Sequence, residues 1–400
     1  MQPSVNIDSN LQSQHIQVFV LKILLKILKL LPGKNQIAKS KLEMILKILV
    51  LASSTNKTIH HTCKNHEGTP TGVTVRNTLK LLFSEIEHTE KILNRLLRSL
   101  VKRKILRGSL IVNSDLLLVE YYGSEEQDIN EIRRSQAKNG TTRFHGYATV
   151  YINLQGQRYT LAITYVWAKD SLLQVLQRLN RYVISYGVKP SLWIVDRGYY
   201  SVEIIKWFQR HQKPFLMPVP KKGLKPDHPN GPSGTRKLYT WNRGNWTRYT
   251  IKSKNDSVTC DMAVVVTYPD GPGQYRNPKV YVYACFGIRH LRLKRIYELY
   301  KSRFGIETSH RQMHEARAKT ASRSPVLRYL FVGIGFVLRN VWIYLHFHVL
   351  YIKRQGSRLI CFDSLTFIAM LDQLRHCIEQ IFPLILETEI EDPARILLIT

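Results

Sequence analysis

The order of strand-like and helix-like segments between residues 110 and 217 constrains the fold of this chain more than any other feature. Short apolar or β-branched runs indicate strands, and longer runs with a period of 3.6 residues indicate helices. The predicted strands are 110–112, 147–152, 159–166, 192–195 and 215–217, and the predicted helices are about 170–186 and 201–211. The order strand, strand, strand, helix, strand, helix, strand predicts an α/β fold in which helices pack on one mixed sheet.

The charge balance indicates the kind of partner that this chain binds. Lysine plus arginine number 59 and aspartate plus glutamate number 29, which gives a formal net charge of +30 and a pI near 10.0. Such a charge opposes compaction by self-repulsion, and a polyanion is its natural counterweight. Double-stranded DNA is therefore the predicted partner, with an anionic membrane surface as the competing interpretation.

Two further patterns favour a cytoplasmic protein that does not bind membranes. The five cysteines are an odd number without paired spacing, as expected of reduced thiols. The most apolar stretch, residues 326–352, contains Arg328 and Arg339, and a charge near a bilayer centre costs about 3 kcal/mol. A buried core helix is predicted there, and no signal peptide is expected because the first residues lack its pattern.

Residues 1–109 are predicted to form an N-terminal helical DNA-binding domain. Amphipathic helical patterns with basic stripes lie at about 16–31, 39–52 and 91–107. The turn Thr69–Gly72 precedes a short polar helix, and this arrangement is compatible with a helix-turn-helix. A basic helical module of this kind suits contacts with DNA phosphates.

Changes in composition divide the remaining chain into four predicted segments. Residues 110–217 form the first part of the core, in which polar residues 124–142 are expected to be a loop and Gln155-Gly156-Gln157 a hairpin turn. A segment rich in proline, glycine and lysine then leads into new strand patterns. The predicted boundaries are 218–290 for a β-rich insertion, 291–350 for the second part of the core and 351–400 for a C-terminal helical tail.

One short stretch carries residue types that belong to a phosphate and metal site. Tyr300, Arg303 and Glu307 stand at offsets 0, 3 and 7, so on one continuous helix they share a narrow stripe. A tyrosine, an arginine and a carboxylate on one face are not typical of a core face. The alternative for Glu307 is a surface carboxylate paired with Arg311 or Arg303.

Two other carboxylates are predicted to join Glu307. Asp115 and Asp196 each follow a predicted strand, and ligand sites in α/β sheets form at the carboxyl ends of strands. If the first and fourth strands are sheet neighbours, these two carboxylates come together. Three carboxylates suit Mg²⁺ or Mn²⁺, and two such ions about 4 Å apart support phosphodiester chemistry. The alternative for Asp115 alone is a turn former or a helix cap.

These residues resemble a known family. Tyr300-x2-Arg303-x3-Glu307 is similar to the signature of DDE transposases of prokaryotic insertion sequences. Asp196-Arg197-Gly198-Tyr199 is similar to the segment around their second aspartate, and Asp115 resembles their first. The resemblance covers about residues 110–350. It implies a ribonuclease H-like core of the retroviral integrase superfamily with a β-rich insertion.

The resemblance also implies a function. It implies an enzyme that cleaves transposon terminal inverted repeats and joins them to target DNA, working as a homodimer on DNA in the prokaryotic nucleoid. Asp115, Asp196 and Glu307 would be catalytic and hold two Mg²⁺ or Mn²⁺ ions. The DNA-binding residues would be Tyr300, Arg303, Arg311 and His314.

One departure from the family pattern keeps other functions open. The family signature continues with a lysine seven residues after the glutamate, and His314 occupies that position here. This favours a second interpretation, a DNA-binding protein derived from a transposase that no longer catalyses cleavage. A third is a ribonuclease H-like nuclease that cuts DNA without joining ends. The terminal repeat sequence, the target preference and the cleavage route do not follow from the sequence.

Overall fold

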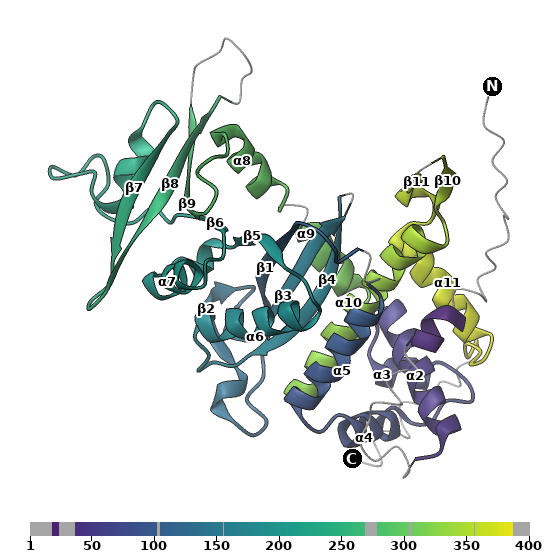
Figure 1. The fold of residues 1–400 in the computed structure, drawn as a ribbon. Coiled ribbons are helices and arrows are strands. Elements are labelled where there is room, and N and C mark those ends of the chain that lie inside the picture. The colour runs from purple at the N-terminus through teal and green to yellow at the C-terminus, as the bar shows by residue number, and fades with distance from the viewer. Residues whose placement is uncertain are drawn as a thin grey trace. The chain divides into compact units, whose positions relative to one another are not determined.

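In the computed structural model of the chain (Figure 1), the described residues are 18–23, 37–101, 105–154, 156–268, 278–303, 306–355 and 357–386. For residues 306–310 and 357 only the backbone is described. The chain forms two compact units, one of Met1–Ile92 with Gln312–Thr400 and the other of Leu93–Arg311. The helix predicted at 16–31 lies largely outside the described residues.

A nine-stranded mixed sheet forms the unit Leu93–Arg311. The strands run in the order β2-β3-β1-β5-β6-β9-β8-β7, and β4 also pairs with β3. Neighbouring strands β1, β5 and β6 are parallel, and the other pairs are antiparallel. The strands are β1 Leu110–Glu120, β2 Arg133–Lys138, β3 Thr141–Leu154, β4 Gln157–Val166, β5 Pro190–Val195, β6 Phe215–Pro218, β7 Asn245–Lys252, β8 Ser257–Thr267 and β9 Lys279–Phe286. This arrangement confirms the predicted α/β fold with a ribonuclease H-like mixed sheet.

Two predicted boundaries at the start of the sheet were wrong. Strand β1 does not end near Asp115 but continues to Glu120, because its backbone pairs with β3 along this whole length. The segment 124–142, predicted as a loop, contains β2, which is joined to β3 by Asn139 and Gly140 at positive φ. Glycine and asparagine tolerate that conformation and favour tight hairpin turns. The strand escaped prediction because it lies at the sheet edge with mostly exposed polar side chains.

The insertion continues the sheet. Strand β9 pairs antiparallel with β6, and Ala284 of β9 lies opposite Met217 of β6. Strand β8 then pairs with β9, and β7 pairs with β8. Helix α6 (Leu172–Ser185) packs on β3 and β4, α7 (Val202–Arg210) packs on β8, and α8 (Leu293–Lys301) packs on β6 and β8 (Figure 1). A core cluster between α8 and the sheet includes Ile194, Leu216, Ile296 and Tyr300. Both predicted core helices are therefore present.

The stretch that was predicted as one continuous helix is divided. Helix α8 ends at Lys301, Arg303 lies in a turn, and α9 begins at Ile306 and ends at Glu315. The turn is closed by the Arg303 amide, which donates to the carbonyl of Tyr300 at 3.0 Å. A glycine at position 305 also disfavours a continuous helix, by about 1 kcal/mol relative to alanine. Tyr300, Arg303 and Glu307 therefore do not share one helical stripe.

Helices dominate the other unit. Its elements include α2 Lys39–Ser54, α3 Ile59–Lys64, α4 Gly72–Leu82, the first half of α5 Ile86–Ser99, α10 Pro325–His348 and α11 Phe367–Glu379. Helix α5 begins and ends earlier than predicted. A small hairpin of β10 (Ile352–Arg354) and β11 (Ser357–Leu359) precedes α11, so the segment expected to be a helical tail is not wholly helical.

Helix α10 is the core helix of this unit. Its length and apolar composition would allow it to cross a bilayer, but 94% of its most apolar window is buried. Gly335 lets α9 approach closely, since a Cβ at this position would lie 2.8 Å from the carbonyl oxygen of Met313. The Trp342 indole donates to the Leu365 carbonyl at 2.7 Å, which ties α10 to the segment before α11. The buried core helix that was predicted within residues 326–352 is therefore confirmed, and it ends at His348.

Candidate active site

Asp115 and Asp196 occupy equivalent positions on neighbouring strands. The last parallel pair between β1 and β5 is Ser114 with Val195, and the two aspartates are the next residues along each strand. The first and fourth predicted strands, β1 and β5, are therefore neighbours, as predicted. This pairing brings the two carboxylates together. Asp115 lies within a longer strand than predicted, but at the end of its parallel pairing. The sheet itself brings these two acids together.

Arg303 joins the two carboxylates. Its Nη2 donates to Asp115 Oδ1 at 2.8 Å and its Nη1 donates to Asp196 Oδ1 at 3.0 Å. The side chains of Arg303 and Asp115 are 8% and 10% exposed, whereas that of Asp196 is 43% exposed. Charged hydrogen bonds of this kind are short and strong, particularly away from solvent. One buried guanidinium thus compensates two acids at the edge of the sheet.

Burial and neighbouring charges set the protonation of this cluster. Burial raises the pKa of Asp115, Arg303 opposes that rise, and Asp196 adds to it. Burial alone would lower the pKa of Arg303, but the nearby Asp115, Tyr300 and Asp196 hold that pKa above its ordinary value. Arg303 therefore remains a cation, and its charge favours the ionised form of Asp115 against the effect of burial.

Two tyrosines support the cluster from within the core. Tyr300 is 6% exposed, packs on Tyr283 at a ring distance of 5.1 Å and accepts a hydrogen bond from Arg303 Nη1 at 2.8 Å. The Tyr199 hydroxyl lies 3.2 Å from that of Ser114, just before Asp115. Burial raises the pKa of both phenols to about 12. Tyr300 thus has a core role that the sequence did not indicate, and its contact with DNA stays a prediction.

Arg158 is a residue of the site that the sequence reasoning missed. It is 3% exposed on β4, its guanidinium lies 4.4 Å from the centre of the Tyr151 ring, and it donates to the backbone carbonyl of Arg303. Burial lowers the pKa of Arg158 to about 10. Arg158 therefore anchors the backbone at Arg303. An arginine in the β-branched and aromatic pattern of β4 was the one available signal.

The remaining predicted site residues lie on α9. Glu307 belongs to the first turn of that helix, and its side chain is outside the described part of the structure. Arg311 is exposed and His314 is half-buried on the same helix. Within the described residues no group of three or more metal-ligating side chains occurs. Asp115 and Asp196 are thus the two predicted metal ligands that the structure brings together.

The donor set nevertheless fits a divalent cation. Carboxylate oxygens are the ligands that Mg²⁺ and Mn²⁺ prefer, and a cation already bridges these two carboxylates. The bridging guanidinium leaves its Nε buried without a hydrogen-bond partner among the described residues. The two carboxylates therefore favour a cation between them, and the hydrogen-bonding capacity of Arg303 is not completely used.

The comparisons with known proteins show the family of the chain. A family model described as the transposase DDE domain matches residues 124–340, more than half of the chain, so the chain belongs to this family. Asp196, Arg303 and Glu307 lie inside the matched range, and Asp115 precedes it. A search among curated proteins finds no match.

A solved structure shares the fold. It is the cryo-EM structure of a piggyBac transposase synaptic complex with hairpin DNA, which matches with a TM-score of 0.51 and 10% sequence identity. The match covers 94% of this chain and 88% of that chain. At such low identity the likeness concerns the fold alone.

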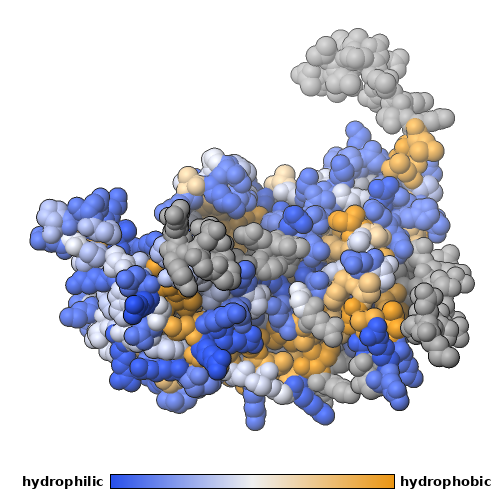
Figure 2. Space-filling model, turned by 90° about the horizontal axis from the view of Figure 1, so that it is seen from above, coloured by the Kyte–Doolittle hydropathy of each residue, from blue (hydrophilic) through white to orange (hydrophobic). Residues whose placement is uncertain are grey.

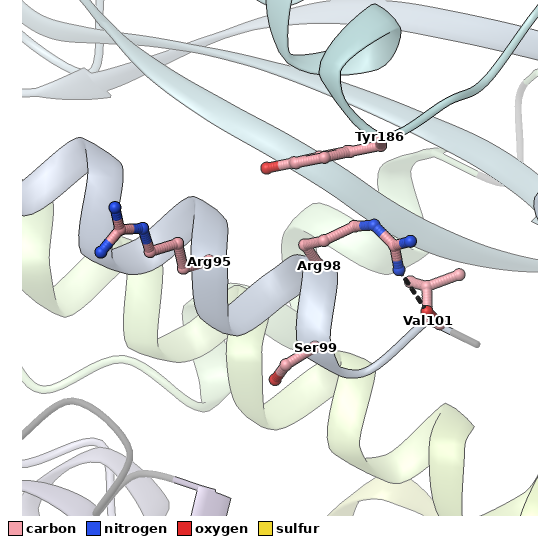
Figure 3. Close-up of a pocket in the computed structure, with 5 residues that line it drawn as sticks. All are labelled: Arg95, Arg98, Ser99, Val101 and Tyr186. Carbon is pink, nitrogen blue, oxygen red and sulfur yellow. Dashed lines mark hydrogen bonds between the residues drawn. The ribbon is translucent and has the colours of Figure 1, made fainter. Parts of the chain in front are cut away.

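A second feature of the same unit is a basic pocket of about 390 Å³ (Figure 3). It is lined by Arg95, Arg98, Ser99 and Val101 from the end of α5, and by Tyr186 from the end of α6. The Arg98 guanidinium lies 5.6 Å from the centre of the Tyr186 ring and donates to the carbonyl of Val101 at 2.6 Å. Two arginines beside an aromatic ring are typical of a nucleic-acid contact.

Figure 2 shows one face on which hydrophilic residues predominate and hydrophobic residues gather in limited patches. With a formal charge of +30, such a surface attracts a polyanion over distances of about one Debye length, roughly 8–10 Å.

Proposed function

We propose that this chain is a DNA transposase that cleaves transposon ends and joins them to target DNA with divalent metal ions. The observation that carries the proposal is the pairing of Asp115 and Asp196 at the end of the parallel β1–β5 ladder, in a chain of the transposase DDE family. The net charge of +30 supports DNA as the partner. A prokaryotic insertion-sequence origin, action as a homodimer and a cytoplasmic location remain predictions.

In the proposed mechanism each residue has a separate task. Asp115, Asp196 and Glu307 would hold the divalent ions. When bound, these ions would activate a water or a 3′-hydroxyl and stabilise the leaving oxygen of a phosphodiester. Arg303 binds a backbone phosphate near the cut, for which the planar guanidinium is suited. Tyr300 and Arg158 keep Arg303 in place, through its side chain and its backbone respectively.

A cleavage and binding assay tests this function. The substrate is a plasmid that carries the DNA flanking the protein's own gene, where the terminal repeats of its element would lie. We expect the wild-type chain to nick this plasmid with Mg²⁺ or Mn²⁺, and Asp196→Asn to abolish nicking while DNA affinity stays within about threefold. The substitution removes a metal ligand and leaves the basic surface intact.

A matched aspartate provides the control. Asp261 lies on β8 in the same unit and pairs with Arg289 at 3.1 Å, so Asp261→Asn should cut normally. If Asp196→Asn loses DNA binding together with cleavage, the proposed role of Asp196 is wrong. Binding of the terminal repeats without any nicking would support the alternative of a DNA-binding protein without catalysis, which His314 at the family's lysine position favours.

A further inference from the structure

One guanidinium occupies the place where the proposed metal ligands converge. Asp115 Oδ1 and Asp196 Oδ1 both accept hydrogen bonds from Arg303, at 2.8 and 3.0 Å. These are oxygens that would bind a metal ion. The side chain of Arg303 is buried between them, at 8% exposure. The carboxylates are therefore already held together by a positive charge that belongs to the chain itself.

The guanidinium and a divalent ion cannot both keep these oxygens. They would compete for the same two oxygens, and two cations at contact distance repel each other strongly where one of them, here Arg303, is buried. Arg303 does not relieve this repulsion by losing its proton, because the neighbouring carboxylates hold its pKa above the ordinary value of an arginine. A metal ion that takes up Asp115 Oδ1 and Asp196 Oδ1 would therefore displace the two hydrogen bonds of Arg303.

The local contacts allow the side chain to leave without unfolding the turn. The backbone of Arg303 is held on both sides, because its amide donates to Tyr300 and its carbonyl accepts from Arg158. The hydrogen bonds that the described residues make with the side chain all involve its Nη atoms, since Nε has no such partner among them. A long arginine side chain on a fixed backbone can change partners by rotating about its own bonds.

A displaced guanidinium needs a new anionic partner. On the proposed function, on which this inference rests, the anion that arrives at the site is the phosphodiester of DNA. Arginine binds phosphate oxygens with the same paired geometry with which it binds carboxylates. Asp196 is 43% exposed, so the site opens to solvent on the side where DNA would enter.

We propose that Arg303 is a resident cation that holds Asp115 and Asp196 before metal binds, and that it transfers to a DNA phosphate when these carboxylates take up divalent metal. Metal binding and DNA binding are then coupled through one side chain. By thermodynamic reciprocity, DNA tightens metal binding by the same factor by which metal tightens DNA binding. The chain alone would hold metal weakly, which limits cutting to the DNA complex.

Binding of Mn²⁺ to the full chain tests this proposal without any measurement of cleavage. Electron paramagnetic resonance of free Mn²⁺ gives the dissociation constant with and without a short DNA duplex of arbitrary sequence. Without DNA, we expect Arg303→Gln to bind Mn²⁺ about tenfold more tightly than wild type, within the usual range for coupled sites. Adding DNA should tighten binding severalfold for wild type and leave Arg303→Gln nearly unchanged.

Three further variants complete the test. Arg303→Lys keeps the charge but cannot bridge two carboxylates in the same way, so we expect an intermediate affinity; it also serves if Arg303→Gln does not fold. Arg289→Gln, which removes an arginine paired with Asp261, should match wild type. The double variant Asp115→Asn/Asp196→Asn lacks both proposed ligands. With DNA present, it measures how much Mn²⁺ binds outside this site, to the DNA itself.

The outcomes separate this inference from the proposed function. If wild type binds Mn²⁺ through Asp115 and Asp196 but the folded Arg303 variants bind it no more tightly, the exchange is wrong and the metal site stands. If no variant binds Mn²⁺ above the double-variant level, with or without DNA, both the exchange and the proposed metal chemistry are wrong.

Discussion

Arg303 donates a 2.8 Å hydrogen bond to Asp115, and both side chains are at most 10% exposed. Breaking a buried pair of this kind by removing one partner leaves an uncompensated charge and is costly, at roughly 3–5 kcal/mol. The pair therefore stabilises the arrangement of the site before metal binds. Because Arg303 occupies Asp115 Oδ1, this oxygen is not freely available to a metal ion.

The role of Glu307 as the third carboxylate can be tested by a conservative substitution. We expect Glu307→Gln to reduce Mg²⁺-dependent plasmid cleavage by at least about 100-fold, because an amide is a much poorer ligand for a hard divalent ion. DNA binding, measured by fluorescence anisotropy, should remain. Glu298→Gln is the matched control, since Glu298 lies on the preceding helix, is 46% exposed and pairs with Arg295 at 3.6 Å. Normal cleavage by Glu307→Gln would show that Glu307 is not a metal ligand.

The basic pocket at the end of α5 predicts a contact with the DNA backbone. We expect Arg95→Gln/Arg98→Gln to weaken DNA binding and to reduce the salt slope by about one for each phosphate that is no longer neutralised. Anisotropy titrations over a range of salt concentrations measure both quantities. Arg375→Gln is a control, because Arg375 lies on α11 and pairs with Glu379 at 3.2 Å. An unchanged affinity and slope in the double variant would exclude the pocket from the DNA-binding surface.

Asn94 is predicted to stabilise the outer edge of the sheet. Its side chain donates to the carbonyl of Ile163 on β4 at 2.9 Å and accepts from the amide of the same residue at 2.8 Å. Asn94→Ala would remove both of these buried hydrogen bonds, which contribute about 0.5–1.5 kcal/mol each. Urea unfolding should show a decrease of this size in the free energy of unfolding, whereas Asn245→Ala, at an exposed position of β7, should change it by less than about 0.5 kcal/mol. Equal stability of both variants would contradict the role of Asn94.

The cysteines provide a test of burial that depends on pH. Burial raises the pKa of Cys260 to about 12 and that of Cys285 well above its ordinary value, so both remain thiols over the pH range 7–9. The thiolate is the reactive form. We expect mass spectrometry to find the exposed Cys361 alkylated first at pH 8, and Cys260 and Cys285 only after denaturation.

Because the folded pKa of Cys260 is raised, the thiol of the unfolded chain ionises at a lower pH than that of the folded chain. The fold is therefore destabilised as pH rises above the ordinary thiol pKa toward 12. Rapid native labelling of Cys260 would contradict its place in the sheet.

Much of the core could be predicted because local patterns there agree with the tertiary fold. The apolar run Leu192–Val195 indicates a buried strand from its composition alone, and β5 occupies residues 190–195. Residues 326–352 indicate a core helix because charges within an apolar stretch exclude a bilayer, and α10 is indeed buried. The edge strand β2 could not be predicted in the same way, since its side chains face solvent and carry no apolar period.

The sequence by itself determined the residue types of the site and their order along the chain. Only the tertiary structure decided which of them meet, because contacts between distant residues depend on strand register. The alignment of Ser114 with Val195 brings Asp115 beside Asp196, and the turn after α8 points Arg303 at both. No local pattern predicts that one buried guanidinium binds both carboxylates. It follows from the low tolerance of a protein interior for uncompensated charge.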